Sequence, residues 1–368
     1  MGPVGRGADR PSRVPTTPHA PHTPARPRPV HTPRPTPYAP RVTPTARSTP
    51  ASGAPLDGLA ALARTAAHPP GATPCGCADG GLVGVLADRE DGTVVRHGAL
   101  VVKAHAPDTD PEAHRARLAL AARPDVADVL LSPLPLPPAA PEVLGGRPVT
   151  AWPYGPPVDP GDPDAAPWEE AARLLALLHR TPLPPGADLP PMRAPLKAAL
   201  AVDRMRRSAP DHPAAATVLA AWGTIPTELM APGNTPHLLC HGDFHLGQLV
   251  RLAPSSPTPS TPPPWRLIDV DDLGLGDPAW DLARPAAWFA AGILPPEVWS
   301  RFLGAYQEAG GPAVGTDPWI RLDVPARALT VQTAALALAK STAEGRPLDE
   351  VEEVMIDTCA RIAGHRTG

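Results

Sequence analysis

Three polar residues stand close together in residues 241–248, where His241 and Asp243 are separated by one residue and Asp243 and Gln248 by four. Asp269 follows downstream, directly after the segment Trp-Arg-Leu-Ile at 265–268. A carboxylate can orient a hydroxyl group for attack, and carboxylate and amide oxygens are ligands that Mg²⁺ prefers. Phosphoryl transfer needs both, since its catalysis consists of positioning reactants and neutralising charge. We therefore expect Asp243 to face a hydroxyl and Gln248 and Asp269 to bind magnesium.

Secondary structure must bring these two segments together. Residues 265–268 predict a short buried strand that delivers Asp269 to the edge of a cleft. Residues 252–264 lie between the segments and are rich in proline, serine and threonine, which predicts a looped-out insertion. The cost of closing a loop grows only with the logarithm of its length, so this insertion does not prevent Asp243 and Asp269 from meeting.

Two motifs, His-Gly-Asp-Phe-His-Leu-Gly-Gln at 241–248 and Gly-Asp-Pro-Ala-Trp-Asp-Leu-Ala at 276–283, together resemble the aminoglycoside phosphotransferase and choline kinase superfamily. The resemblance covers roughly residues 80–365. It implies an α+β, protein-kinase-like bilobal fold, with a small β-rich N-terminal lobe and a larger helical C-terminal lobe. It also implies ATP and Mg²⁺ as cofactors and a small-molecule hydroxyl compound as the acceptor.

The resemblance gives roles to individual residues. Asp243 looks like the catalytic aspartate, Gln248 stands at the metal-binding asparagine, and Asp269 matches the aspartate of the kinase Asp-Phe-Gly triplet, with Asp271 assisting a second metal. The glutamine-ending loop resembles that of maltokinases, which points to a sugar hydroxyl. The alternative for Asp243 and Asp269 is a pair of solvated turn aspartates, but two motifs in the right order favour the functional interpretation.

Four further residues of the motifs are predicted to support the loop rather than to react. The two histidines, His241 and His245, are more readily explained by hydrogen bonds that hold the loop. Asp277 precedes Pro278 and can cap a following helix. Asp281 lies four residues later in the same motif, and we expect both acids to act as scaffold.

The segment before residue 151 should form the nucleotide-binding lobe. Residues 82–86, 91–95 and 99–104 predict short strands, and Lys103 on the third is the candidate to pair with the α- and β-phosphates. Residues 110–120 predict a helix that offers Glu112 as a partner for Lys103, although an acid in a first turn is explained equally well by the helix dipole. The glycines of 79–84 do not form a complete Gly-x-Gly-x-x-Gly loop.

Residues 147–155 predict a strand that runs into a turn where a hinge between two lobes should lie, and a helix is predicted at 168–179. Trp152 or Tyr154 could flank an adenine ring, although large aromatic residues at a strand end more often belong to the core. We expect a tail at 1–55, an N-terminal lobe at 56–151 and a C-terminal lobe at 152–366.

Composition sets broader limits. The chain has 58 prolines, many of them before residue 55, which predicts a disordered, basic, proline-rich tail. No signal-peptide pattern or membrane-length apolar run is present, so we expect a cytoplasmic protein with no membrane partner. A net charge of −4 argues against nucleic acid as a partner. The four cysteines show no disulfide or zinc pattern.

Apolar residues at helical spacing predict helices at 284–289, 296–303, 321–340 and 348–363. These should build the lobe that holds the acceptor, where an acid such as Asp323 could meet it. Two functions remain open: an ATP- and Mg²⁺-dependent kinase acting on an amino sugar or a neutral sugar, and a catalytically idle nucleotide-binding or regulatory module. The sequence leaves the oligomeric state undetermined.

Overall fold

The computed structural model describes residues 54–68, 84–138, 140–183, 188–226, 237–252 and 263–364. Several features named above lie outside these residues: the tail up to residue 53, the thiols of Cys75 and Cys77, glycines 80 and 81, and the proline-rich residues 253–262. Everything below concerns the described residues.

A five-stranded antiparallel sheet forms the smaller lobe, with the strand order β1-β2-β3-β5-β4. The strands are β1 (Gly84–Arg89), β2 (Gly92–His97), β3 (Leu100–His105), β4 (Val143–Leu144) and β5 (Arg147–Pro153). The predicted strand runs at 82–86, 91–95 and 99–104 therefore correspond to β1, β2 and β3, with ends that differ by one to three residues. Val102 and Ala104 of β3 face the apolar core, and Lys103 between them points to the opposite face, as strand alternation requires.

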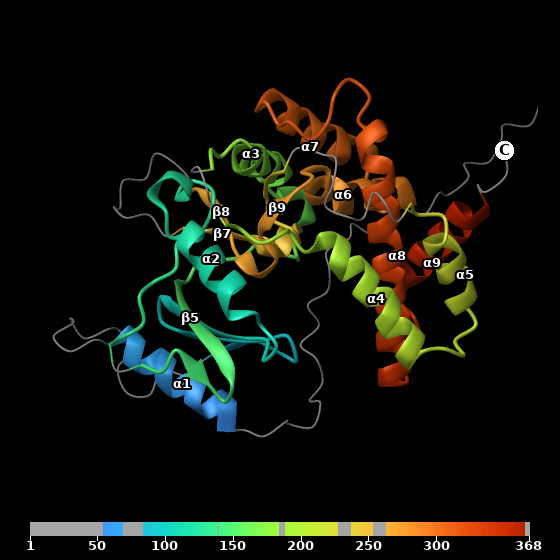
Figure 1. Cartoon of the computed structure of the whole chain (residues 1–368). Helices are drawn as coiled ribbons and strands as arrows, with labels where there is room; N and C mark the ends of the chain where they lie inside the picture. Colours follow the sequence, from blue (N-terminus) through green and yellow to red (C-terminus); the bar gives the residue numbers. More distant parts are fainter. Residues whose placement is uncertain are drawn as a thin grey trace, which may run out of the picture. The chain divides into compact units, whose positions relative to one another are not determined.

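One helix that the sequence analysis does not predict covers this sheet. Helix α1 (Ala54–Ala67) packs on β2 and β3, where Leu59 and Ala63 are fully buried against Val95 and Val102. Figure 1 shows α1 in blue beside the labelled β5. This small apolar core is separate from the larger core of the helical lobe. Ala151 belongs to the smaller core and Trp152 to the larger one.

The larger lobe is built mainly from helices. They are α2 (Pro111–Ala121), α3 (Trp168–His179), α4 (Ala194–Ser208), α5 (Ala215–Trp222), α6 (Ala279–Ala291), α7 (Pro296–Glu308), α8 (Trp319–Glu344) and α9 (Glu350–Gly364). Helix α8 packs against α4, α6 and α9, and α3 packs against α7 (Figure 1). In this part of the chain, no helix is long and apolar enough to cross a membrane.

The predicted helix at 284–289 is only the second half of α6, which begins at Ala279. Pro285 lies inside the helix. The side chain of Asp277, predicted to cap a following helix, does so by accepting a hydrogen bond from the Ala279 N–H (3.0 Å). Helices α4 and α5 were also not predicted.

Two short strand pairs shape the segments that carry the polar motifs. Strand β6 (Leu238–Cys240) pairs with β9 (Gly274–Gly276), and β7 (Leu249–Arg251) pairs with β8 (Trp265–Leu267). Residues 253–262 connect β7 to β8, and the Leu252 N–H donates to the Pro264 carbonyl (3.0 Å) at the base of this connection. The loop after β6 and the loop after β8 are thereby placed side by side.

Candidate active site

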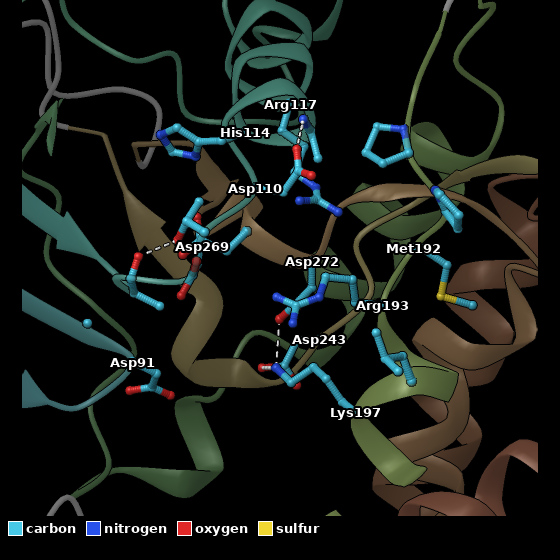
Figure 2. A pocket seen from close by; sticks show the side chains of 18 of the residues that line it. Asp91, Asp110, His114, Arg117, Met192, Arg193, Lys197, Asp243, Asp269 and Asp272 are labelled. Carbon is cyan, nitrogen blue, oxygen red and sulfur yellow. Dashed lines mark hydrogen bonds and ion pairs between the residues drawn. The ribbon is translucent and has the colours of Figure 1, made fainter. Parts of the chain in front are cut away.

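A cavity of about 800 Å³ lies among the sheet, α2, α4 and the loops that follow β6 and β8. Most of the predicted site residues line it; they are Lys103, Asp243, His245, Gln248, Asp269, Asp271 and Asp277. Figure 2 shows Asp243, Lys197 and Asp272 at its lower part and α2 with His114 and Arg117 above. Glu112, Trp152 and Tyr154 do not line this cavity.

The backbone of the loop that carries Asp243 is fixed by a buried carboxylate. Asp281 of α6 accepts hydrogen bonds from the N–H groups of His241 (2.6 Å) and Gly242 (2.8 Å), and His179 Nε2 donates to the same carboxylate (2.9 Å). Gly242 has φ of +82°, and a Cβ atom there would lie 2.1 Å from the Asp272 carbonyl oxygen. The loop therefore requires both Asp281 and a glycine at 242.

The two loop histidines make local hydrogen bonds. His241 is fully buried, and its Nε2 donates to the carbonyl oxygen of Ile268 (2.8 Å), which ties the loop to the residue before Asp269. His245 Nδ1 accepts a hydrogen bond from the Gly247 N–H (3.1 Å) at the turn that leads to Gln248. Burial lowers the pKa of His245 to about 4, so its ring is neutral at neutral pH.

Two cations hold the carboxylate of Asp243. Lys197 Nζ lies 2.8 Å from Oδ2, and an Arg284 guanidinium nitrogen lies 2.8 Å from Oδ1. Burial alone would raise the pKa of Asp243, but Lys197 and Arg284 lower it well below its usual value. Lys197 also contacts Asp272 (2.6 Å). Asp243 is therefore a fixed, ionised carboxylate at the wall of the cavity.

Lys197 and Arg284 were not predicted as site residues. Arg284 directly follows the motif that ends at Ala283, so its position in the sequence is a usable signal. Lys197 lies in α4, which carries no motif, and about 46 residues separate it from its partner Asp243. The packing of α4 against α8 brings this lysine to the loop, together with the hydrogen bond from the Arg193 N–H to the Asp272 carbonyl (3.1 Å) just before the helix.

Asp269 follows β8 directly and has the backbone conformation of a left-handed residue (φ 64°, ψ 76°), which no other non-glycine residue in the described ranges adopts. Its Oδ2 lies 3.5 Å from Gln248 Nε2. A half-turn of the Gln248 amide would present its oxygen instead, and two oxygens at about this separation can share one magnesium ion. The pair therefore fits the predicted magnesium site.

Lys103 joins the sheet to the segment after β8. Its Nζ lies 2.7 Å from Asp269 Oδ1 and 2.9 Å from Asp271 Oδ2. Burial alone would lower the pKa of Lys103, but the two carboxylates raise it above its usual value. Asp271 also contacts His105 Nδ1 (3.0 Å) and so already has two basic partners. Its role as a second magnesium ligand remains a prediction.

The predicted ion pair between Lys103 and Glu112 is not formed. Glu112 is exposed in the first turn of α2, and Asp110 caps this helix by accepting hydrogen bonds from the N–H groups of Glu112 (2.9 Å) and Ala113 (2.8 Å). Asp269 and Asp271 take the place of Glu112 as partners of Lys103. The helix start thus explains the acid at 112 without a role in nucleotide binding.

The two aromatic residues of the predicted hinge have other neighbours. Trp152 is buried in the larger core, and its Nε1 donates to Thr150 Oγ1 (2.8 Å). The Tyr154 ring lies under the Arg96 guanidinium, 3.3 Å from its Cζ, and the Tyr154 N–H donates to the Ala99 carbonyl (2.7 Å). These contacts agree with the core alternative for Trp152 and place neither ring in the cavity.

Comparison with known proteins identifies relatives of the chain. A family model described as "Phosphotransferase enzyme family" matches residues 85–322. Choline kinase LicA from Streptococcus pneumoniae is similar in structure (TM-score 0.51, 14% identity), over 77% of this chain and 93% of that chain. A choline/ethanolamine kinase family protein from Mesorhizobium loti gives a TM-score of 0.50 at 18% identity, over 77% and 88%.

A thermostable mutant of aminoglycoside phosphotransferase APH(4)-Ia, in its apo form, is also similar (TM-score 0.50, 13% identity), over 78% of this chain and 95% of that chain. No curated protein matches the chain. At these identities the structural likeness shows the fold alone. It confirms the predicted α+β, kinase-like fold.

Proposed function

The chain belongs to the phosphotransferase enzyme family, and we propose that it transfers the γ-phosphate of ATP to a hydroxyl group of a small molecule. One observation carries this proposal: Lys103, Asp243, Gln248 and Asp269, predicted from separate parts of the sequence, line a single cavity. Family membership supports the reaction class, and the four side chains supply what phosphoryl transfer needs.

Each of these side chains is given a role in phosphoryl transfer that agrees with its contacts. Asp243 orients the acceptor hydroxyl and accepts its proton as the hydroxyl oxygen bonds to the γ-phosphorus, while the bond from that phosphorus to the bridging oxygen breaks and ADP leaves. Gln248 and Asp269 hold Mg²⁺, which neutralises charge on the phosphates when it is bound. Lys103 contacts the α- and β-phosphates, exchanging part of its present pairing with Asp269 for them. Lys197 keeps Asp243 ionised and positioned.

The charges beside Asp243 favour a neutral acceptor, such as a sugar, over a polycationic amino sugar. On the side of the cavity formed by α4 and α6, every lining carboxylate of the described residues already has a basic partner. These pairs are Asp243 with Lys197 and Arg284, Asp272 with Lys197 and Arg193, and Asp277 with Arg321. A polycation would have to displace these partners, whereas a neutral hydroxyl compound need not.

Asp323 does not contribute to this side of the site. Its side chain is exposed and pairs with Arg327 along the surface of α8, and it is not among the residues that line the cavity. An acceptor placed beside Asp243 would therefore not meet Asp323.

One observation favours the idle alternative. Both oxygens of Asp243 are engaged by cations, and the pKa of this carboxylate is lowered, so it is a weaker base than a free aspartate. A nucleotide-binding module without turnover would tolerate such pairing. We favour the enzyme because oriented approach, rather than basicity, supplies most of what a hydroxyl acceptor needs in this reaction.

Acceptor-stimulated ADP release in the presence of Mg²⁺ tests the proposal. The panel contains neutral sugars including maltose, aminoglycosides, choline and other amino alcohols. We expect turnover with a neutral sugar and a loss of at least about a hundredfold in Asp243→Asn. Asp323→Asn, the same chemical change at an exposed site, should retain full activity. ATP binding without turnover on any acceptor, unchanged in Asp243→Asn, would favour the idle module instead.

A further inference from the structure

Three side chains beside the proposed phosphate site form a second cluster of metal-ligating groups. They are His105 at the end of β3, His114 in α2 and Asp271 after β8. One ligand atom from each residue lies within 4.8 Å of the ligand atoms of the other two. No step of the proposed phosphoryl transfer uses either histidine.

His114 is the least explained of the three. Only 7% of its surface is exposed, it lines the cavity, and within the described part of the chain its ring makes no hydrogen bond. Its neighbour is the His105 ring, which it meets edge to face at 4.4 Å between centroids. Its ring nitrogens are not sealed from solvent, because His114 lines the cavity, so they are accessible to a ligand bound there.

His114 is also in the protonation state that a metal requires. Burial, and next the charge of His105, lower the pKa of His114 to about 4, so its ring is neutral at neutral pH and a nitrogen lone pair is available. The charge state therefore agrees with the geometry.

His105 and Asp271 are already oriented toward one another. His105 Nδ1 lies 3.0 Å from Asp271 Oδ2, and His105 Nε2 lies 2.7 Å from Thr150 Oγ1. The hydroxyl of Thr150 fixes the ring through the nitrogen that faces away from Asp271. A metal-binding histidine is usually held in this way through its second nitrogen.

We propose that His105, His114 and Asp271 bind a divalent transition metal of the zinc class. Imidazole nitrogens favour such a metal over Mg²⁺, which prefers oxygen ligands. Zinc bonds of about 2.0–2.1 Å place ligand atoms roughly 3.4 Å apart, and the three ligand atoms already lie within 4.8 Å of one another, so only a small adjustment is needed. Asp271 and His114 both line the cavity, which leaves the fourth position open to water or to a small ligand.

The proposed site shares Asp271 with Lys103. A bound metal would draw this carboxylate away from the lysine, and zinc should therefore inhibit phosphoryl transfer. This effect on activity rests on the proposed function. Metal binding itself does not, and a direct binding measurement separates the two.

The test uses the untagged full chain, freed of metal by a chelator and titrated with Co²⁺ as a spectroscopic probe in the presence of excess Mg²⁺. We expect one equivalent to produce the visible absorption of four-coordinate cobalt, and Zn²⁺ to displace it. Binding through thiolates such as Cys75 and Cys77 would appear separately, as charge-transfer absorption. The histidines of the N-terminal segment provide a background that is the same in every variant.

Three variants decide the outcome. His114→Gln should weaken cobalt and zinc binding at least tenfold, and His237→Gln, at a histidine of the same cavity outside the cluster, should bind as the native chain does. His114→Cys keeps a ligand at this position and should bind cobalt with new thiolate absorption, which also shows that the site is folded. Equal affinity in His114→Gln and the native chain, or no visible band in any of them, would overturn the proposal.

Discussion

Replacing Asp281 by asparagine removes a charge from a fully buried carboxylate that holds the Asp243 loop. Asp281 accepts three hydrogen bonds, from the N–H groups of His241 and Gly242 and from His179 Nε2. Asparagine has one oxygen, so its NH₂ group must face at least one of these donors. One unmatched buried donor costs about 1–3 kcal/mol, and the loss of charge weakens each remaining bond by about 1 kcal/mol. We expect the free energy of unfolding to fall by about 3–5 kcal/mol in total.

Urea unfolding followed by circular dichroism measures this loss. Asp323→Asn is the matched control, because that carboxylate is exposed on α8 and its removal should cost about 0.5 kcal/mol or less. A loss below about 1 kcal/mol in Asp281→Asn would refute the reasoning, since it would mean that the three donors find other acceptors.

The pH dependence gives a second check on Asp281. Burial alone would raise the pKa of Asp281, but the hydrogen bond from His179 and the other contacts lower it. A carboxyl group whose pKa is lowered by folding stabilises the protein above its unfolded pKa of about 3.9, and this contribution is lost as the pH falls through the folded pKa. The difference between the native chain and Asp281→Asn should therefore shrink in acid. A constant difference down to that range would contradict the assigned charge.

Three further outcomes can be measured. Gly242→Ala should lower both the melting temperature and turnover, because its Cβ would meet the Asp272 carbonyl oxygen and its φ is positive; an unchanged melting temperature would contradict this. Gln248→Ala should raise the Mg²⁺ concentration for half-maximal turnover by roughly tenfold, and an unchanged requirement would remove Gln248 from the metal site. The pKa of His114 is about 4 in the folded chain, so the unfolded chain takes up a proton at this residue first as the pH falls. The free energy of unfolding should therefore decrease by up to about 3 kcal/mol between pH 6.5 and 4. His114→Gln should lack this part of the decrease.

The parts of the fold that the sequence predicts are those with a strong local pattern. Helix α3 matches its predicted range at both ends, and strands β1 to β3 match within three residues, since alternation and helical spacing are properties of neighbouring residues. The apolar spacing at 284–289 covers only part of α6, although Asp277 and Pro278 mark its start in the sequence. Helix α1 directly follows the proline-rich tail in the sequence, and its apolar residues are explained only by their packing on the sheet.

The same division applies to the site. The sequence motifs identify Asp243, Gln248 and Asp269, and the structure gathers all three around one cavity. Contacts between distant segments have no local signal. Lys103 pairs across 166 residues with Asp269 rather than with the nearby Glu112, and Lys197 reaches Asp243 from a helix without a motif. Such contacts depend on how whole elements pack, which neither spacing nor composition encodes.

Because β7 pairs with β8, the geometry of the site does not depend on the length of the chain between its two motifs. Gln248 and Asp269 precede and follow this pair, and the hydrogen bond from Leu252 to Pro264 closes the hairpin below residues 253–262. Doubling such a connection costs only about 0.6 kcal/mol. A search that fixes the interval between the two motifs would overlook chains of this kind. The same connection is a natural place to insert a fluorescent or affinity domain without displacing Gln248 and Asp269.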